Sequence, residues 1–202
     1  MAAIYCIGRN YKKHAEELGN AIPTEPMIFL SSPIALRPLK EGDLAFSNET
    51  FHYEAELVLR IGYDHHLGEK FNKNSIESLS FGIDLTRRVE QTRLKEKGHP
   101  WTTSKSFLGS KPLGDFYPIS QFKNLKKVKY NFYVEGSLRQ AGNTENMIFS
   151  IEDIINHFNS FSPLKKGDLI FTGTPEGVGE IKKGVKFKFE FPELNIIEEG
   201  KL

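Results

Sequence analysis

Short stretches of alternating or continuous apolar residues dominate the chain. Alternation is clearest at 187–191, where Phe occupies every second position and Lys188 and Glu190 lie between. A period of two is typical of half-buried strands, and short apolar runs bounded by Gly, Pro or Asn are typical of buried ones. The predicted strands are 27–30, 54–62, 79–84, 128–134, 168–172 and 187–191.

Three further segments have the features of helices. They are 10–18, 86–97 and 151–161. The third is the clearest, because its Ile and Phe side chains form one stripe and Ser150 precedes it as an N-cap, with Asp153 near the capping-box position. Strands and helices do not alternate regularly, so a doubly wound parallel sheet is not expected. No repeat or linker divides the chain, and we expect a single β-rich domain over residues 1–202.

Composition and charge exclude several classes of protein. The 202 residues carry 27 basic and 26 acidic side chains, so the net charge of +1 gives no basic footprint for nucleic acid or an anionic membrane. No apolar run approaches the roughly 20 residues of a membrane span, and the N-terminus lacks the pattern of a signal peptide. We therefore expect a cytoplasmic protein with no nucleic-acid or membrane partner. The single cysteine, Cys6, excludes a disulfide within the chain, and its apolar surroundings predict a buried, unreactive thiol.

Two glutamates at the start of a predicted strand are candidate metal ligands. On a strand, Glu54 and Glu56 point to the same side, about 7 Å apart. The strand continues into the apolar run 57–59, where two carboxylates would repel each other and lose hydration, and a divalent cation would relieve both costs. Oxygen ligands favour Mg²⁺, Mn²⁺ or Ca²⁺ over zinc. Taken alone, the two residues favour the alternative that they form the polar face of a half-exposed strand.

A third carboxylate, Asp84, ends the predicted strand 79–84. Three carboxylates at strand positions would suit a hard cation that keeps open positions for water and substrate. The alternative is that Asp84 caps the helix predicted from Thr86.

Other residues are candidates for catalysis. His14 and Glu17 are three positions apart on a predicted helix, which suits a histidine general base oriented by a carboxylate, although exposed pairs of this kind are common. Lys105, flanked by aromatic residues, could stabilise an anion or could extend from a loop into solvent. The glycine-rich segment 172–179 could offer backbone N–H groups to an anion, or could simply form a corner.

Together, these residues belong to a series of short motifs along the chain. The motifs are Gly8-Arg9-Asn10-Tyr11, His14-x-x-Glu17, Glu54-x-Glu56, Asp84-x-Thr86-x-Arg88-x-x-Gln91, Trp101-Thr102, Lys105-Ser106-Phe107, Met147-Ile148-Phe149-Ser150, Gly167-Asp168, Thr172-Gly173-Thr174-Pro175 and Gly177-Val178-Gly179. In this order they resemble the fumarylacetoacetate hydrolase family, most closely its short acylpyruvase / oxaloacetate decarboxylase branch. The resemblance covers roughly residues 4–189.

The resemblance implies an α+β fold, a β-rich mixed arrangement of rolled sheets with a few short helices, and a homodimer. It implies Mg²⁺ or Mn²⁺ held by Glu54, Glu56 and Asp84. It also implies that His14 and Glu17 activate water and that Lys105 stabilises developing negative charge. The side chains that would contact the carboxylate and keto oxygens of the substrate are those of Arg9, Arg88, Gln91, Lys105 and Thr174.

The expected activity is metal-dependent cleavage of a C–C bond in an acylpyruvate or similar β-diketo acid. Oxaloacetate decarboxylation is expected beside it, because both reactions produce the enolate of pyruvate. One alternative is isomerisation or hydration of 2-hydroxydienedioates, which arise in aromatic catabolism. A second is a β-rich binding module in which the cation has only a structural role.

Overall fold

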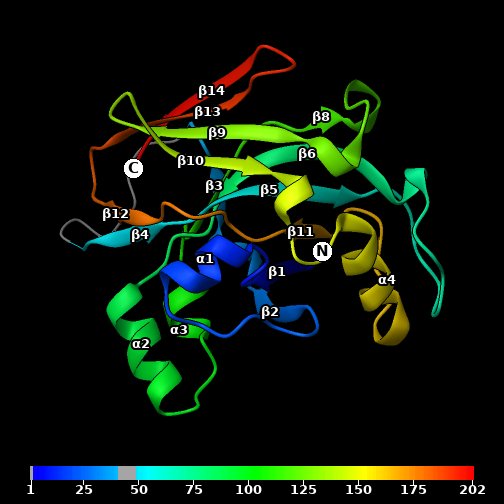
Figure 1. Ribbon diagram of the computed structural model, residues 1–202, viewed down its shortest axis with the longest axis horizontal. Helices are drawn as coiled ribbons and strands as arrows, with labels where there is room; N and C mark the ends of the chain where they lie inside the picture. The colour runs from blue at the N-terminus through cyan, green and yellow to red at the C-terminus, as the bar shows by residue number, and fades with distance from the viewer. Residues whose placement is uncertain (1, 41–48) are drawn as a thin grey trace.

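Three sheets make up most of the computed structural model, which describes residues 2–40 and 49–202 (Figure 1). The largest sheet has eight strands, with β2, β1, β11, β5, β6, β7 and β3 side by side and β8 paired to β6. Its strands are β1 (Ile4–Gly8), β2 (Met27–Ser31), β3 (Leu36–Pro38), β5 (Ala55–Ile61), β6 (Ile76–Ile83), β7 (Lys111–Leu113), β8 (Tyr117–Pro118) and β11 (Leu169–Phe171). Most pairs are antiparallel, but β1 pairs with β11 and β3 with β7 in parallel.

Two smaller sheets complete the β structure. One runs β10-β9-β13-β14 and the other pairs β12 with β4. The strands are β4 (Phe51–Tyr53), β9 (Lys129–Val134), β10 (Ser137–Asn143), β12 (Gly179–Ile181), β13 (Lys186–Phe191) and β14 (Ile196–Lys201). Figure 1 draws the four-stranded sheet on one side of β5 and β6, and α1, α2 and α3 on the other.

Four helices lie outside the sheets in the described ranges. They are α1 (Lys12–Glu17), α2 (Arg88–Glu96), α3 (Thr102–Lys105) and α4 (Ile151–Phe161). Single 3-10 turns occur at Pro33–Ala35, Lys73–Ser75, Ile119–Gln121, Leu125–Lys127 and Thr144–Asn146. No helix in the part of the chain that the structure describes is long and apolar enough to cross a membrane.

Both faces of the central strands are buried, which explains their nearly continuous apolar sequences. On one face, Phe81 of β6 stacks on Phe189 and Phe191 of β13, with ring centroids 4.9 and 3.9 Å apart. On the other, Val58 and Phe171 belong to a second cluster that also contains Cys6. Cys6 is buried, as predicted, and burial raises the pKa of its thiol.

The predicted β-rich α+β fold is therefore confirmed. The helix predicted at 151–161 has the predicted bounds, and Ser150 and Asp153 form a complete capping box. The helix predicted at 86–97 is shorter, from Arg88 to Glu96, and its N-cap residue is Arg87. Asp84 is therefore not the cap of α2.

Candidate active site

The structure brings most of the predicted site residues to one cavity beside the ends of β1, β6 and β11. Those that line it are Arg9, His14, Glu54, Glu56, Asp84, Arg88, Gln91, Lys105 and Thr174. Glu17 does not line the cavity but contacts His14, which does. The fold thus gathers residues that are distant in sequence.

Strand register places the three carboxylates together. Ala55 of β5 pairs with Ile83 of β6, so Glu54, just before β5, lies beside Asp84, just after β6. The Asp84 backbone N–H donates to the Glu54 carbonyl oxygen at 2.8 Å. Glu56 joins them from β5, and one ligand atom from each residue lies within 4.8 Å of the others.

All three acids are buried, with exposed fractions of 6%, 2% and 1% for Glu54, Glu56 and Asp84. The alternative of a half-exposed polar strand face is therefore wrong. Buried carboxylates need compensating charge, because their desolvation in a low-dielectric interior is costly.

Lys105 supplies part of that charge. Its Nζ donates to Glu54 Oε2 at 2.6 Å, to Asp84 Oδ2 at 3.0 Å and to Thr86 Oγ1 at 2.7 Å. Burial alone would lower the pKa of Lys105, but Asp84 and Glu54 outweigh it and raise the pKa. Lys105 is only 3% exposed, so the alternative that it extends into solvent is wrong.

Arg88, at the start of α2, covers the other side of Glu54. Its Nη2 donates to Glu54 Oε1 and its Nη1 donates to Gln91 Oε1, both at 2.6 Å. Burial would raise the pKa of Glu54, but Lys105 and Arg88 together lower it well below its usual range. Glu54 is therefore ionised at neutral pH.

Among the described residues, Glu56 is the carboxylate of the trio that has no cationic partner. Among the described residues its carboxylate has one hydrogen-bond donor, the Gly173 backbone N–H at 2.7 Å from Oε2. Burial and the neighbouring Asp84 and Glu54 raise its pKa well above its usual range. Because three carboxylates converge and one lacks a cationic partner, the oxygen-only donor set fits a hard divalent cation.

The glycine-rich segment does donate backbone N–H groups, but to carboxylates of the chain itself. Gly173 bonds Glu56, and Gly177 N–H lies 3.2 and 3.3 Å from the two carboxylate oxygens of Glu17. Both glycines have a φ of about 95° (97° and 95°), a conformation that side chains disfavour. A Cβ on Gly177 would lie 2.2 Å from the Arg139 carbonyl oxygen, so the turn requires glycine there.

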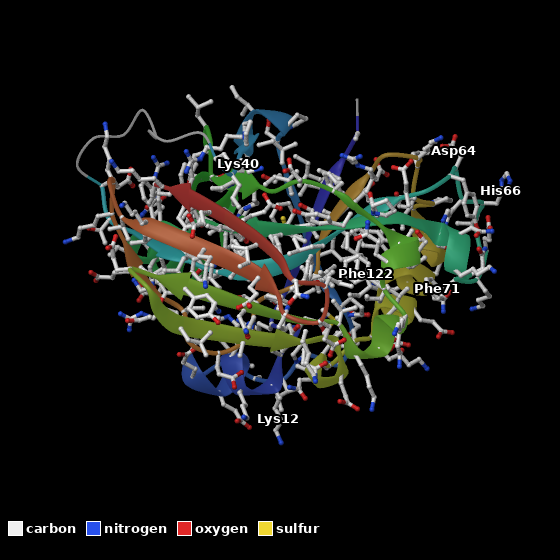
Figure 2. The ribbon with its side chains drawn as sticks, turned by 90° about the horizontal axis from the view of Figure 1, so that it is seen from above. Lys12, Lys40, Asp64, His66, Phe71 and Phe122 are labelled. Carbon is white, nitrogen blue, oxygen red and sulfur yellow. The ribbon has the colours of Figure 1, made fainter. Side chains whose placement is uncertain are left out.

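Helix α1 turns His14 inward beside Glu17. Figure 2 shows Lys12 of the same helix pointing away from the molecule, whereas His14 is buried. His14 Nδ1 lies 3.4 Å from Glu17 Oε2, and the Gly177 backbone N–H donates to the Glu17 carboxylate. Burial lowers the pKa of His14, so the imidazole is neutral at pH 7 and able to accept a proton.

Lys111 is a buried residue of this cluster that the sequence analysis does not identify. It is completely buried on β7, where its Nζ donates to Asp84 Oδ1 and, at 2.9 Å, to the Lys105 carbonyl oxygen. Asp84 thus holds an ammonium group at each carboxylate oxygen. Nothing in Lys111-Pro112-Leu113 distinguishes this lysine from a surface one, so only the strand pairing could reveal it.

Asn10 and Gln140 position other parts of the cavity wall. The Asn10 side chain donates to the carbonyl oxygens of Phe149 and Thr172 and accepts from Phe149 N–H, which ties three segments together. Gln140 Nε2 donates to Thr174 Oγ1 at 2.8 Å, and that hydroxyl donates to the Ala55 carbonyl oxygen. Asn10 lies in one of the quoted motifs, but Gln140 does not.

Comparisons with known proteins show which family this chain is similar to. The family model described as "Fumarylacetoacetate (FAA) hydrolase C-terminal" matches residues 3–199. The mitochondrial oxaloacetate decarboxylase of Dictyostelium discoideum is 37% identical over 188 residues, 92% of this chain and 86% of that protein. An oxaloacetate tautomerase of Escherichia coli (strain K12) is 34% identical over 195 residues, 95% of this chain and 89% of that protein.

A solved structure is similar over the whole chain. It is the fumarylpyruvate hydrolase of Pseudomonas aeruginosa in complex with Mn²⁺ and pyruvate, 32% identical, with a TM-score of 0.86. The likeness covers 100% of this chain and 89% of that one. The chain belongs to the fumarylacetoacetate hydrolase family.

Proposed function

We propose that this chain is a divalent-metal-dependent enzyme that cleaves acylpyruvates and related β-diketo acids through the enolate of pyruvate. The observation that carries the proposal is the convergence of three buried carboxylates, the His14–Glu17 pair and the Lys105 ammonium on one cavity. A purely structural cation site would need neither a neutral buried histidine nor a lysine at the cavity wall.

Glu54, Glu56 and Asp84 are the proposed ligands of the cation. Mg²⁺ and Mn²⁺ fit their oxygen atoms best, and Ca²⁺ is a third candidate. A cation bound there would act as a Lewis acid toward the oxygens of a keto acid. The Pseudomonas aeruginosa relative with Mn²⁺ and pyruvate supports this choice.

Substrate binding is proposed for Arg9, Arg88, Gln91 and Thr174. Arg9 Nε and Arg88 Nε are buried without a hydrogen-bond partner in the described structure, although both residues line the cavity. Buried donors of this kind are normally satisfied, so a carboxylate or keto oxygen is the expected partner. The Thr174 hydroxyl already accepts a hydrogen bond from Gln140 and donates one to the Ala55 carbonyl oxygen. Its side chain would therefore shape the cavity wall and would not hold the substrate by itself.

In the proposed hydrolysis, His14 removes a proton from water while Glu17 orients the imidazole. The hydroxide attacks the distal carbonyl carbon, and the C–C bond on its pyruvate side then breaks. The bonding electrons become the enolate of pyruvate, whose negative charge lies near Lys105. Protonated His14 returns its proton to the enolate carbon, giving pyruvate and a carboxylic acid.

Oxaloacetate is the second candidate substrate, favoured by the decarboxylase and tautomerase relatives. Loss of CO₂ from oxaloacetate produces the same enolate, and tautomerisation moves a proton between carbon and oxygen of the same unit. Neither reaction needs an activated water. Isomerisation of 2-hydroxydienedioates would also use the cation, with the proton delivered to a different carbon.

His14→Gln should separate these reactions. Because only hydrolysis requires a base for water, acylpyruvate hydrolysis should fall by roughly 10²–10⁴-fold, whereas oxaloacetate decarboxylation should fall much less. Steady-state kinetics of both reactions at saturating Mn²⁺ measures the difference. Equal losses in the two reactions would contradict the role given to His14.

The pH dependence of hydrolysis follows from the state of His14. Its pKa lies below the ordinary value of 6.5 because it is buried, so the active neutral form persists below pH 6.5 and is lost only at lower pH. A profile of kcat/KM for acetylpyruvate should therefore have the midpoint of its acid-side fall below pH 6.5. An acid-side midpoint at or above pH 6.5 would argue against a neutral, buried base.

The proposed function is tested by a substrate panel. Acetylpyruvate, fumarylpyruvate and oxaloacetate would be assayed with Mg²⁺ or Mn²⁺, before and after chelation, following the enol absorbance. Turnover of an acylpyruvate that disappears on chelation and returns with metal supports the proposal. Turnover of oxaloacetate alone would instead favour the second candidate.

A further inference from the structure

One lysine of the cavity has no part in the chemistry proposed above. Arg88, Gln91 and Lys95 are spaced i, i+3 and i+7 on α2, so they share one face of the helix, and all three line the cavity. Arg88 contacts Glu54 at the start of the helix. The backbone of Lys95 lies seven residues further on, roughly 10 Å along the helix axis from that of Arg88.

Lys95 and Arg9 together leave positive charge uncompensated. Arg88, Lys105 and Lys111 are each bonded to a carboxylate of the trio. In the described ranges, by contrast, neither Arg9 nor Lys95 has a carboxylate within 4.0 Å, and Arg9 Nε is buried without a partner. Two cations of the cavity wall thus have no ion-pair partner among the described residues.

The surroundings of Lys95 hold it in place. Its Nζ lies 5.2 Å from the centroid of the Trp101 ring, which also lines the cavity. The side chain is half-buried. Burial, followed by the positive charges of Arg9 and Arg88, lowers the pKa of Lys95 more than the negative charge of Glu54 raises it.

We propose that Lys95, with Arg9, binds the distal carboxylate of a keto diacid and makes the site selective for diacids over keto monoacids. The inference rests on the proposed function for the position of the keto end, which would lie at the carboxylate trio beside Lys105. The chain of the substrate then extends along α2 from Arg88 toward Lys95. The distal carboxylate supplies the ion-pair partner that Lys95 and Arg9 lack among the described residues.

The direct test compares two acylpyruvates that differ at the distal end. Fumarylpyruvate carries a second carboxylate there, and acetylpyruvate carries a methyl group. In Lys95→Met, kcat/KM for fumarylpyruvate should fall by roughly 10–100-fold, the range of one hydrogen bond to a charged group, while that for acetylpyruvate stays within about twofold. Lys95→Arg should restore most of the loss.

Lys97 provides a matched control, because it is an exposed lysine just beyond the end of the same helix. Lys97→Met should leave both substrates unaffected. If Lys95→Met lowers turnover of both substrates equally, or of neither, Lys95 only packs against Trp101 and the inference is wrong.

Binding of unreactive acids separates this inference from the proposed function. 2-Oxoglutarate and 2-oxopentanoate have the same number of carbons but two and one carboxylates, and neither is a β-diketo acid. Calorimetry with the Mn²⁺-loaded protein should show tighter binding of 2-oxoglutarate, a preference lost in Lys95→Met. If no acylpyruvate is turned over but this preference is present, the proposed function fails and the inference stands. Equal binding of both acids by the wild type overturns the inference.

Discussion

Glu56→Gln is expected to abolish divalent-cation binding and, with it, turnover of every keto acid. Glu56 is the carboxylate of the trio without a bonded ammonium or guanidinium group in the described structure, so its oxygen atoms are the most available to a cation. Substitution of a residue that only hydrogen-bonds a metal ligand typically lowers metal affinity by roughly 10–100-fold. Loss of a ligand itself should lower the affinity by at least roughly 100-fold. Calorimetric titration with Mn²⁺ measures the loss.

The same substitution should not weaken the metal-free fold. Glutamine keeps an oxygen for the Gly173 N–H and removes an acid whose ionisation is opposed by burial and by Asp84 and Glu54. The melting temperature without metal should therefore equal or exceed that of the wild type. Glu198→Gln is the control. Glu198 is also buried, but it bonds Asp115 and Tyr117 away from the cavity, so Mn²⁺ binding should be unchanged. Normal Mn²⁺ affinity in Glu56→Gln would contradict the proposed ligand set.

Lys105→Met is expected to have the second large effect. The enolate would lose its nearby ammonium group, and removal of one such donor typically costs roughly 10²–10³-fold in kcat. Glu54 and Asp84 would also lose a buried ion-pair partner, which should lower the free energy of unfolding by about 3 kcal/mol. Kinetics at saturating Mn²⁺ and urea unfolding without metal measure the two effects separately.

Lys111→Met is the matched control for Lys105. It removes the other buried ammonium group from Asp84, but Lys111 does not line the cavity. A comparable loss of stability is expected, with a fall in kcat of only roughly 10-fold, because Asp84 loses orientation and not the charge beside the substrate. If kcat falls equally in the two variants, Lys105 acts by positioning Asp84 and not by stabilising the enolate.

Much of the fold can be predicted from the sequence wherever the local pattern of apolar and polar residues is strong. The stripe and cap of 150–161 predict α4 correctly, and alternation at 187–191 identifies β13. The edge strand β14, with the sequence Ile-Ile-Glu-Glu-Gly-Lys, has no clear alternation, and its partner β13 determines its conformation. The single domain, the homodimer and the cytoplasmic location remain predictions.

The candidate site is harder to predict from the sequence, because its acidic and basic side chains come from separate segments of the chain. Glu54, Glu56 and Asp84 can each be explained locally as a strand face or a helix cap, and only the pairing of β5 with β6 brings them together. Lys111 and Lys95 carry no local signal of burial or of a cavity. The net charge of +1 conceals a cluster in which three buried acids face Arg88, Lys105 and Lys111.

The most direct test of a metal-dependent site at this trio is a single titration of chelator-treated protein with Mn²⁺. Bound Mn²⁺ and acylpyruvate turnover would be measured in the same samples, for the wild type and for Glu56→Gln. The proposed site predicts that wild-type turnover starts near zero and rises in proportion to bound metal up to one ion per chain, whereas Glu56→Gln binds none and stays inactive. Full turnover by wild-type protein that holds no metal would contradict it.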